Sequence, residues 1–244
     1  MRILVTGLNG SVAPKVATVL ESKGLTIVPY NREFISTKSL EAIETFIKTV
    51  CVDACIHFAT GSVEWTKLLA DITKKYGVKL LYISTVMVFD PKTQKAPFKI
   101  SDPLLGKGDY ASYKIESEKV LNTYNHVSIV RLGWQIDYLT TTNNMLNFLK
   151  AQIEKSGTYK ASKNWYPACS FMKDTALGLY EILFLEPGIY HLDSNDGVSM
   201  YEIVQFLSQI HPWIKVNDQG SFKQDNRLQT TVNIKTISTY IKES

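Results

Sequence analysis

The sequence predicts an α/β protein built on a doubly wound parallel sheet. Short apolar runs, each suited to a strand buried on both faces, alternate with helical patterns along the first half of the chain. A glycine-containing turn joins the first run to the first helix. The predicted strands span 2–6, 25–30, 54–58, 80–83 and 127–132. Strands that alternate with helices in this way imply one parallel sheet covered on both faces.

The predicted helices follow these strands in order. Residues 14–23 carry apolar side chains at helical spacing and end at Gly24, a residue type that commonly ends helices. Further helices are predicted over 64–76, which ends at Gly77, over 110–124 and over 173–185. Residues 134–170 and 190–244 leave the strand–helix rhythm. We therefore expect a single domain over 1–244, with these two segments forming a smaller part of it.

Composition excludes several classes of protein. Of the 244 residues, 45% are hydrophobic and 20% are charged, which is typical of globular domains. The net charge is only +4, and the sequence contains no long run of basic residues. Nucleic acid and membrane surfaces are therefore not expected partners. No apolar run reaches the roughly 18 residues that span a bilayer, and the amino terminus lacks a signal-peptide layout. Cys51 and Cys55 are expected to be buried small side chains, and no metal site is expected. With Cys169 the chain has three cysteines, too few for a disulfide framework, and we expect a cytoplasmic protein.

The turn after the first strand has the pattern of a dinucleotide-binding turn. Gly7 can take the tight turn, and Gly10 lets the backbone approach a pyrophosphate. Amides at the start of the following helix would face the negative charge of that group. Two incidental glycines are the alternative, but the strand before and the helix after favour a dinucleotide.

The end of the second strand favours NADP(H) over NAD(H). Many NAD-binding chains carry an acidic residue there, which accepts hydrogen bonds from the ribose hydroxyl. Here Asn31 is neutral, and Arg32 can form a charge-assisted fork with a 2′-phosphate. Glu33 could pair with Arg32 or reach the ribose itself, and a solvated surface arginine is the alternative interpretation.

Tyr110 and Lys114 lie four residues apart in a predicted helix and therefore share one face. A nearby ammonium group lowers the pKa of a phenol, which can then exchange a proton with an alcohol or carbonyl oxygen. Tyr113 is expected to point away from Lys114. Thr85 ends a buried strand, where open α/β sheets bind ligands, and its hydroxyl can hold a substrate oxygen beside Tyr110. A chance surface pair is the alternative, but the order of these motifs favours catalysis.

These motifs together resemble the extended short-chain dehydrogenase/reductases, and most of all the dTDP-4-dehydrorhamnose reductase group. The matching segments are 6–10, 83–90, 110–114, 131–134, 188–192, 199–202 and 225–228, so the resemblance covers nearly the whole chain. It implies a Rossmann-like fold in which residues 134–170 and 190–244 build a small carboxyl-terminal substrate lobe.

The resemblance also implies a role for each site residue. Tyr110 would donate a proton to the reduced carbonyl, Lys114 would bind the nicotinamide ribose and lower the pKa of Tyr110, and Thr85 would orient the carbonyl. Trp134 matches a tryptophan that contacts the sugar nucleotide, although a core aromatic is the alternative. The predicted cofactor contacts are Gly7, Gly10, Ser11, Val12, Asn31, Arg32, Ala59, Thr60, Gly61, Ile83, Tyr110 and Lys114.

The substrate side departs from the group pattern. Val86 and Met87 stand where the rhamnose enzymes carry Asp and Tyr, two polar residues that help to hold the substrate. We therefore expect Thr85, Val86 and Trp134 to contact the substrate in a less polar pocket. The segment from Trp165 to Phe171 could stack on a base or sugar ring, or serve only in packing.

The sequence thus predicts an NADP(H)-dependent reductase of the keto group of a nucleotide-linked 4-keto-6-deoxysugar. The particular sugar and the position of the carbonyl stay open, as does assembly into a homodimer. One alternative is a nucleotide-sugar epimerase or dehydratase with tightly held NAD, against which Asn31 and Arg32 argue. Another is a non-catalytic NADP-binding regulatory subunit, like that of methionine adenosyltransferase, against which the intact Thr85, Tyr110 and Lys114 argue.

Overall fold

A parallel sheet of six strands forms the centre of the computed structural model, which describes residues 1–138 and 144–243. The strand order is β10-β5-β4-β3-β1-β2, and every neighbouring pair runs parallel. The strands are β1 (Arg2–Thr6), β2 (Thr26–Pro29), β3 (Ala54–His57), β4 (Lys79–Thr85), β5 (Val127–Leu132) and β10 (Ile189–Leu192). The chain turns from β2 back past β1 to β3, so the strand order reverses beside β1. Ligands bind at such reversals in open α/β sheets.

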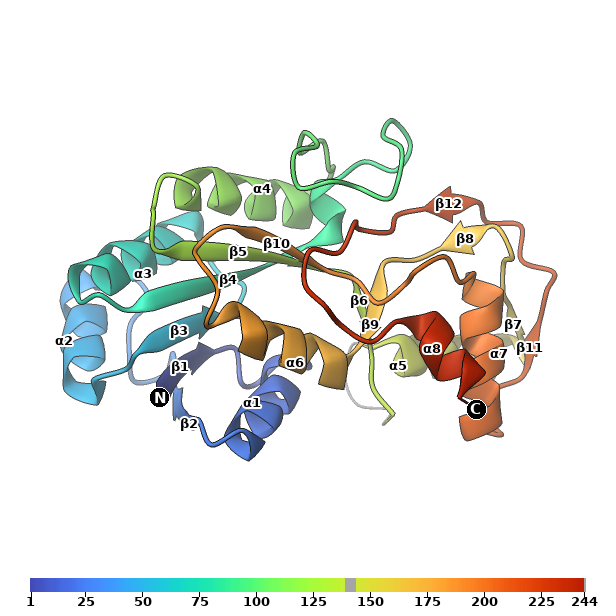
Figure 1. Ribbon diagram of the computed structural model, residues 1–244, viewed down its shortest axis with the longest axis horizontal. Helices are drawn as coiled ribbons and strands as arrows, with labels where there is room; N and C mark the ends of the chain where they lie inside the picture. Colours follow the sequence, from blue (N-terminus) through green and yellow to red (C-terminus); the bar gives the residue numbers. More distant parts are fainter. Residues whose placement is uncertain (139–143, 244) are drawn as a thin grey trace.

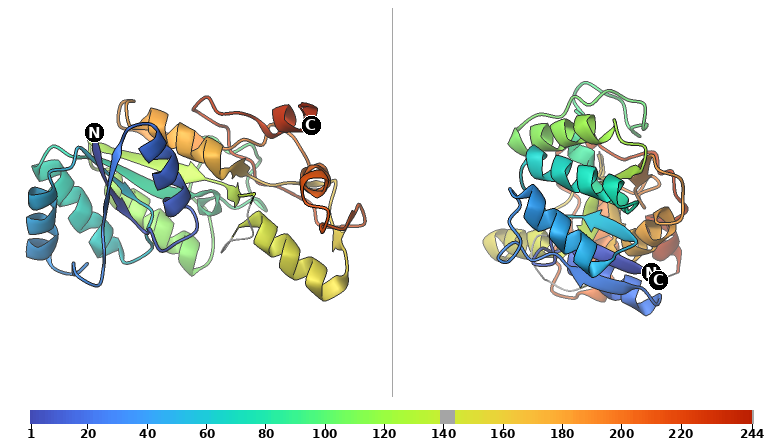
Figure 2. Two further views of the ribbon diagram at one scale, coloured as in Figure 1. Left: turned by 90° about the horizontal axis from the view of Figure 1, so that it is seen from below. Right: turned by 90° about the vertical axis from the view of Figure 1, so that its left-hand side faces the viewer.

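Helices cover both faces of this sheet (Figures 1 and 2). Helices α1 (Ala13–Ser22) and α6 (Met172–Ile182) pack together on one face, where the core includes Ile3 and Leu179. The other face carries α2 (Leu40–Val50), α3 (Val63–Lys75) and α4 (Asp109–Leu121), over a core that includes Leu69 and Tyr82. The predicted doubly wound, Rossmann-like α/β fold is therefore confirmed.

Local sequence explains where these elements begin and why they are buried. Strands β4 and β5 are almost wholly buried, as expected for central parallel strands with helices on both faces. The hydroxyls of Ser39 and Ser62 accept hydrogen bonds from backbone amides of α2 and α3, and so cap both helices. Pro14 stands in the first turn of α1, where its missing N–H has no cost.

The carboxyl-terminal segments build a smaller body at one end of the sheet (Figure 1). Its helices are α5 (Met145–Ser156), α7 (Met200–Ile210) and α8 (Ile237–Lys242), around a core that includes Leu149 and Phe171. Three short parallel pairs complete it: β6 (Trp134–Ile136) with β9 (Cys169–Phe171), β7 (Tyr159–Lys160) with β11 (Val216–Asn217), and β8 (Trp165–Tyr166) with β12 (Gln224–Asp225). Residues 139–143 of the predicted lobe lie outside the described residues.

Three details differ from the sequence-based expectation. Strand β10 belongs to the central sheet, so residues 190–192 do not form part of the lobe. Helix α2 was not expected; Ile43 and Ile47 bury its apolar face. Cys51 is exposed rather than buried; it follows the last residue of α2 and has φ 47°. Cys55 is buried as expected, and Cys169 is buried as well.

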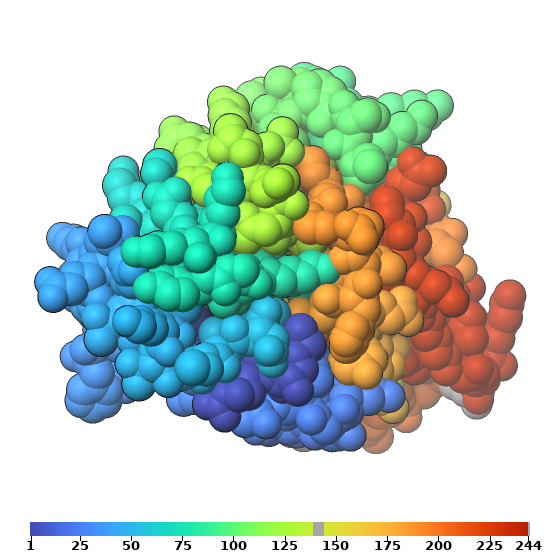
Figure 3. Space-filling view, turned by 60° about the vertical axis from the view of Figure 1, so that its left-hand side comes forward, coloured from blue at the N-terminus to red at the C-terminus, as the bar shows by residue number. Residues whose placement is uncertain are grey.

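The two parts of the chain also separate on the surface (Figure 3). Residues of the first half, blue to green, cover the sheet side, and the red carboxyl-terminal residues gather at the opposite side. The long segment between strand β4 and helix α4 projects beyond α4 (Figure 1), and its Phe98 forms a parallel bridge with Leu228. In the described part of the chain, no helix is long and apolar enough to cross a membrane.

Candidate active site

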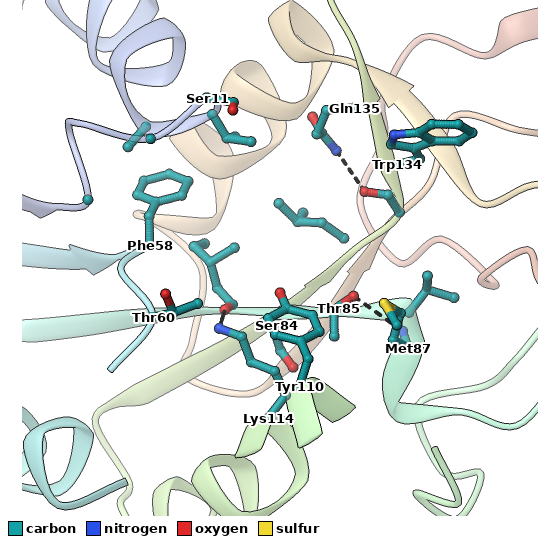
Figure 4. A pocket seen from close by; sticks show the side chains of 18 of the residues that line it. Ser11, Phe58, Thr60, Ser84, Thr85, Met87, Tyr110, Lys114, Trp134 and Gln135 are labelled. Atoms are coloured by element: carbon teal, nitrogen blue, oxygen red, sulfur yellow. Dashed lines mark hydrogen bonds between the residues drawn. The ribbon is translucent and has the colours of Figure 1, made fainter. Parts of the chain in front are cut away.

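A cleft of about 860 Å³ opens at the carboxyl ends of the central strands, where the lobe meets the sheet (Figure 4). One side carries the turn after β1 and the end of β3; the other side carries the segment after β4 and the lobe. The described residues that line it are Gly7, Asn9, Gly10, Ser11, Val12, Ala13, Arg32, Phe58, Ala59, Thr60, Ile83, Ser84, Thr85, Val86, Met87, Tyr110, Lys114, Leu132, Gly133, Trp134, Gln135, Trp165, Pro167, Ala168 and Asn226.

The turn after β1 requires glycine and leads directly into helix α1. Gly7 has φ +81°, and a Cβ there would lie only 2.9 Å from the Ala59 nitrogen. The Gly10 amide donates to the Gly7 carbonyl at 2.8 Å, which tightens the turn. Together with Ser11 and Val12, both glycines line the cleft beside the amino-terminal end of α1. This backbone is suited to a pyrophosphate, which could approach closely where side chains are absent.

A buried polar cluster holds the ends of β1 and β3 together beneath this turn. The Thr6 hydroxyl accepts a hydrogen bond from the Ala59 amide at 3.1 Å and lies 2.8 Å from Nδ1 of His57. Nε2 of His57 lies 3.4 Å from the Thr66 hydroxyl. Burial, together with the charge of Lys114, lowers the pKa of His57 to about 3. His57 is therefore a neutral structural histidine near pH 7.

Tyr110, Thr85 and Lys114 meet at the centre of the cleft (Figure 4). Tyr110 and Lys114 come from successive turns at the start of α4, and Thr85 ends β4. Lys114 is buried, and its Nζ donates to the Ile83 carbonyl at 2.6 Å. The Tyr110 side chain is 42% exposed. A phenol and a hydroxyl are thus presented side by side at the carboxyl edge of the sheet.

The electrostatics of this group differ from the expectation. Removal from water raises the pKa of Tyr110, although a side-chain hydrogen bond to Thr85 opposes the shift. The Nζ atom of Lys114 lies 5.9 Å from the Tyr110 ring centre and donates its hydrogen bond to the Ile83 carbonyl. Burial lowers the pKa of Lys114 itself to about 8. Tyr113 also differs, since its ring centre is 5.4 Å from Nζ rather than turned away, but this residue does not line the cleft.

Of the two predicted cofactor residues after β2, Arg32 lines the cleft and Asn31 is not among the described lining residues. Nη1 of Arg32 donates to the Thr60 carbonyl at 3.2 Å, while Cζ lies 5.9 Å from the Trp65 ring centre. Oδ1 of Asn31 accepts from the Glu33 amide at 2.9 Å and so shapes the turn. Within the described residues, no ion pair joins Arg32 to Glu33.

The segment after β3 contributes two of its three predicted residues. Ala59 and Thr60 line the cleft. Gly61 does not do so among the described residues; a Cβ there would lie 2.6 Å from the Trp65 ring, so glycine lets that ring pack closely.

The side of the cleft opposite the glycine turn is largely apolar and aromatic. Val86, Met87 and Trp134 line it, and Met87 is 52% exposed. The rings of Trp134 and Trp165 are stacked with centres 6.2 Å apart, and Nε1 of Trp165 donates to Oδ1 of Asn226 at 3.2 Å. Two indole faces and one carboxamide are thus grouped at the lobe side of the cleft.

Several lining residues escaped the sequence interpretation. Gln135 is held by the Thr175 hydroxyl at 2.8 Å and the Gly133 carbonyl at 3.1 Å. Asn226 lies in the matching segment 225–228, but the sequence assigned a role at the site to neither residue. Trp165 lines the cleft, and the sequence had marked its aromatic segment as one that could stack on a ring of a ligand. Phe171, which was expected to share that role, is buried in the lobe core and does not line the cleft. No group of three or more potential metal ligands occurs among residues 1–138 and 144–243.

Comparison with known proteins identifies the sequence family. A sequence model described as the RmlD substrate binding domain matches residues 62–211, which is more than half of the chain. No curated protein sequence matches the chain.

Solved structures show that the fold is shared with enzymes of several activities. A dTDP-4-dehydrorhamnose reductase from Bacillus anthracis str. Ames, in complex with NADP, has a TM-score of 0.78 at 15% identity, covering 99% of this chain and 96% of its own. A dTDP-4-dehydrorhamnose reductase from Clostridium acetobutylicum ATCC 824 has a TM-score of 0.79 at 19% identity, covering 94% of this chain and 90% of its own. A UDP-N-acetylglucosamine 4-epimerase from Bacillus cereus has a TM-score of 0.77 at 20% identity, covering 94% of this chain and 87% of its own. At these identities the likeness establishes the fold.

Proposed function

The chain belongs to the RmlD substrate binding domain family, and from this membership we propose that it is an NADP(H)-dependent reductase. The proposed substrate is a nucleotide-linked 4-keto-6-deoxysugar, whose keto group is reduced to an alcohol. One observation carries the proposal: Thr85, Tyr110 and Lys114 meet in the same cleft as the glycine turn. A hydrogen-bonding hydroxyl, a proton donor and a dinucleotide cradle are the parts that carbonyl reduction needs.

The proposed reaction divides the work between the cofactor and the chain. NADPH, held by the glycine turn and Lys114, would supply the hydride that reduces the carbonyl carbon. Thr85 donates a hydrogen bond that orients the carbonyl oxygen, and Tyr110 gives that oxygen its proton, so that an alcohol and NADP⁺ result. Lys114 then serves as the buried cation beside the ribose, with its pKa of about 8 keeping much of it charged near pH 7.

The preference for NADP(H) rests on Arg32. Its guanidinium lies at the cleft with no carboxylate partner among the described residues, and one Nη1 hydrogen bond to Thr60 leaves further donors for a phosphate. A 2′-phosphate placed there would gain a charge-assisted hydrogen bond. The similar reductase from Bacillus anthracis str. Ames was solved with NADP, which supports the same choice.

The nucleotide-sugar substrate is proposed from the lobe side of the cleft. Trp134 and Trp165 present stacked rings, which suit the flat faces of a base or a sugar ring. Val86 and Met87 make the wall near Thr85 apolar, which favours a deoxygenated sugar over a fully hydroxylated one.

A nucleotide-sugar epimerase or dehydratase is the second candidate, because it would also use Thr85, Tyr110 and Lys114. The epimerase from Bacillus cereus has a similar fold. Arg32 favours an exchangeable NADP(H) and therefore a reductase. A regulatory subunit would not need a catalytic tyrosine that is open to the cleft, as Tyr110 is at 42% exposure. We propose a cytoplasmic enzyme, in keeping with free cysteines at Cys51, Cys55 and Cys169.

The proposal is tested by mixing the purified protein with NADPH and a panel of dTDP-, UDP- and GDP-linked 4-keto-6-deoxysugars. A reductase oxidises one NADPH for each alcohol formed. An isomerised sugar without net NADPH oxidation would favour the epimerase, and NADPH binding without any turnover would favour the regulatory subunit.

A further inference from the structure

A row of polar residues crosses three neighbouring strands beside the candidate active site, and one of them, Ser84, lines the cleft. Ser84 on β4 is the register partner of Arg131 on β5, and Arg131 is the register partner of His191 on β10. All three side chains are at most 3% exposed. Such a row in the centre of a sheet is costly to bury unless its members are hydrogen-bonded.

Glu118 of helix α4 completes this row. The Arg131 guanidinium binds its carboxylate in a fork, with Nη2 2.7 Å from Oε2 and Nε 3.2 and 3.1 Å from the two oxygens. The Ser84 hydroxyl also donates to Oε1. Nη1 of Arg131 lies 3.1 Å from Nε2 of His191. Burial and the Arg131 charge lower the pKa of His191 to about 4, so its ring is neutral and accepts this hydrogen bond.

The position of Glu118 on its helix links this row to the cleft. Tyr110, Lys114 and Glu118 follow one another at intervals of four residues and therefore lie along one face of α4. Lys114 donates to the carbonyl of Ile83, the residue directly before Ser84. Helix α4 is thus tied to strand β4 at two successive turns, once by an ammonium and once by a carboxylate.

We propose that Glu118 is a positioning residue: held by Arg131 and Ser84, it fixes the turn of α4 that carries Lys114 and sets the charge around that ammonium group. The role in catalysis rests on the proposed function. Stability alone does not account for the pair, because apolar residues of similar volume often replace a buried ion pair without loss.

The tyrosine and histidine side chains around Lys114 are neutral, so Glu118 is the carboxylate that balances the charge of its ammonium group. Nζ faces the ring of Tyr82 on β4 at 4.5 Å, and the rings of Tyr113 and Tyr110 on its own helix at 5.4 and 5.9 Å. Burial raises the pKa values of Tyr82 and Tyr110, so both are neutral near pH 7. On β3, His57 is neutral as well, since its pKa is about 3. The Glu118 carboxylate raises the pKa of Lys114, which opposes the effect of burial. Arg131 on β5 forms an ion pair with this carboxylate.

The test measures the titration of Lys114 directly, so that its outcome does not depend on activity. The full chain is labelled with ¹³C at the lysine ε-carbons, and the Lys114 signal is assigned by its loss in Lys114→Met. The variants are Glu118→Gln, the double variant Glu118→Gln/Arg131→Met, and Glu116→Gln as the matched control. Glu116 lies on the same helix but is exposed. Thermal unfolding checks that each variant is folded.

Each variant has a distinct expected result. Glu118→Gln leaves Arg131 uncompensated, so the Lys114 midpoint falls by about one pH unit or more. The double variant removes both charges and returns the midpoint towards the wild-type value, while Glu116→Gln leaves it unchanged. An unchanged midpoint in folded Glu118→Gln would overturn the proposal.

A kinetic readout covers the case in which Glu118→Gln does not fold. The double variant buries no uncompensated charge and is expected to fold. Turnover with NADPH and the active sugar nucleotide should then fall about 10- to 100-fold in kcat with KM little changed, because the helix is no longer held in register. A wild-type kcat in the folded double variant would contradict the positioning role. If wild-type protein turns over no sugar in the panel, the proposed reductase fails, while the titration still decides the link between Glu118 and Lys114.

Discussion

The Lys114 ammonium lies 5.9 Å from the centre of the Tyr110 ring, and its hydrogen bond goes to the Ile83 carbonyl rather than to the phenol. Burial raises the pKa of Tyr110. A raised pKa suits the proposed direction of reaction, because a proton donor must hold its proton until hydride transfer creates an alkoxide. The alkoxide is far more basic than a phenolate and takes the proton from Tyr110 at that moment.

Replacing Lys114 with methionine should weaken NADPH binding and slow turnover together, because the variant loses both the proposed ribose contact and the buried charge. In the wild type, whose Lys114 has a pKa of about 8, kcat/KM should fall as the pH rises above about 8 and the ammonium is lost. Fluorescence titration with NADPH and a pH–rate profile measure the two effects. Lys119→Met, an exposed change on the same helix, is the control and should behave as wild type. Unaltered NADPH affinity in Lys114→Met would contradict the ribose contact.

Replacing Arg32 with glutamate should move cofactor preference from NADPH towards NADH. A hydrogen bond to a charged group contributes about 1.5–3 kcal/mol, so the ratio of the two kcat/KM values should change by roughly 10- to 100-fold. Lys38→Glu makes the same charge reversal at an exposed residue outside the described lining and should leave the ratio alone. An identical ratio in Arg32→Glu and wild type would remove the assignment of Arg32 to the 2′-phosphate.

Replacing Val86 with aspartate and Met87 with tyrosine should alter the choice among sugar nucleotides. Both positions line the cleft next to Thr85, and a new hydrogen bond to a sugar hydroxyl would change selectivity by about 1–3 kcal/mol. The measurement is kcat/KM across the sugar-nucleotide panel for wild type and the double variant. Matching profiles would mean that these side chains do not face the sugar.

Acid should destabilise the fold partly through His57. In the unfolded chain a histidine takes up a proton below about pH 6.5, whereas the folded protein keeps His57 neutral down to about pH 3. Between those values the unfolded state binds more protons, so stability falls with falling pH by up to about 1.4 kcal/mol per unit from this residue. Urea unfolding at pH 7 and pH 4 should show a smaller loss in His57→Gln. Equal losses in the two proteins would contradict the shifted pKa.

Local sequence patterns predicted the parts of the site that depend on neighbouring residues. Gly7 and Gly10 shape one turn, and Tyr110 and Lys114 share one helix face, so spacing alone identifies them. The hydrogen bond of the Lys114 amino group could not be predicted in this way, because its acceptor is the carbonyl of Ile83 in strand β4.

Residues brought in by long-range packing could not be found in this way. Gln135 and Asn226 reach the cleft because the lobe folds back over the sheet. The first follows the matching segment 131–134 and the second lies in 225–228, but neither segment indicated that these side chains reach the cleft. Strand β10 joins β5 after a separation of more than fifty residues, so its place at the sheet edge was missed. Asn31 was predicted at the cofactor, but its side chain shapes the turn through the Glu33 amide.

The central claim is that Tyr110 donates the proton in an NADPH-dependent reduction, and Tyr110→Phe tests it most directly. The measurement is kcat and NADPH affinity for Tyr110→Phe on the active sugar nucleotide, with Tyr113→Phe as the control because Tyr113 lies outside the described cleft lining. We expect kcat to fall about 10²- to 10⁴-fold in Tyr110→Phe with NADPH affinity largely kept, and Tyr113→Phe to stay active. Wild-type turnover by Tyr110→Phe, or loss of turnover in Tyr113→Phe alone, would contradict the account.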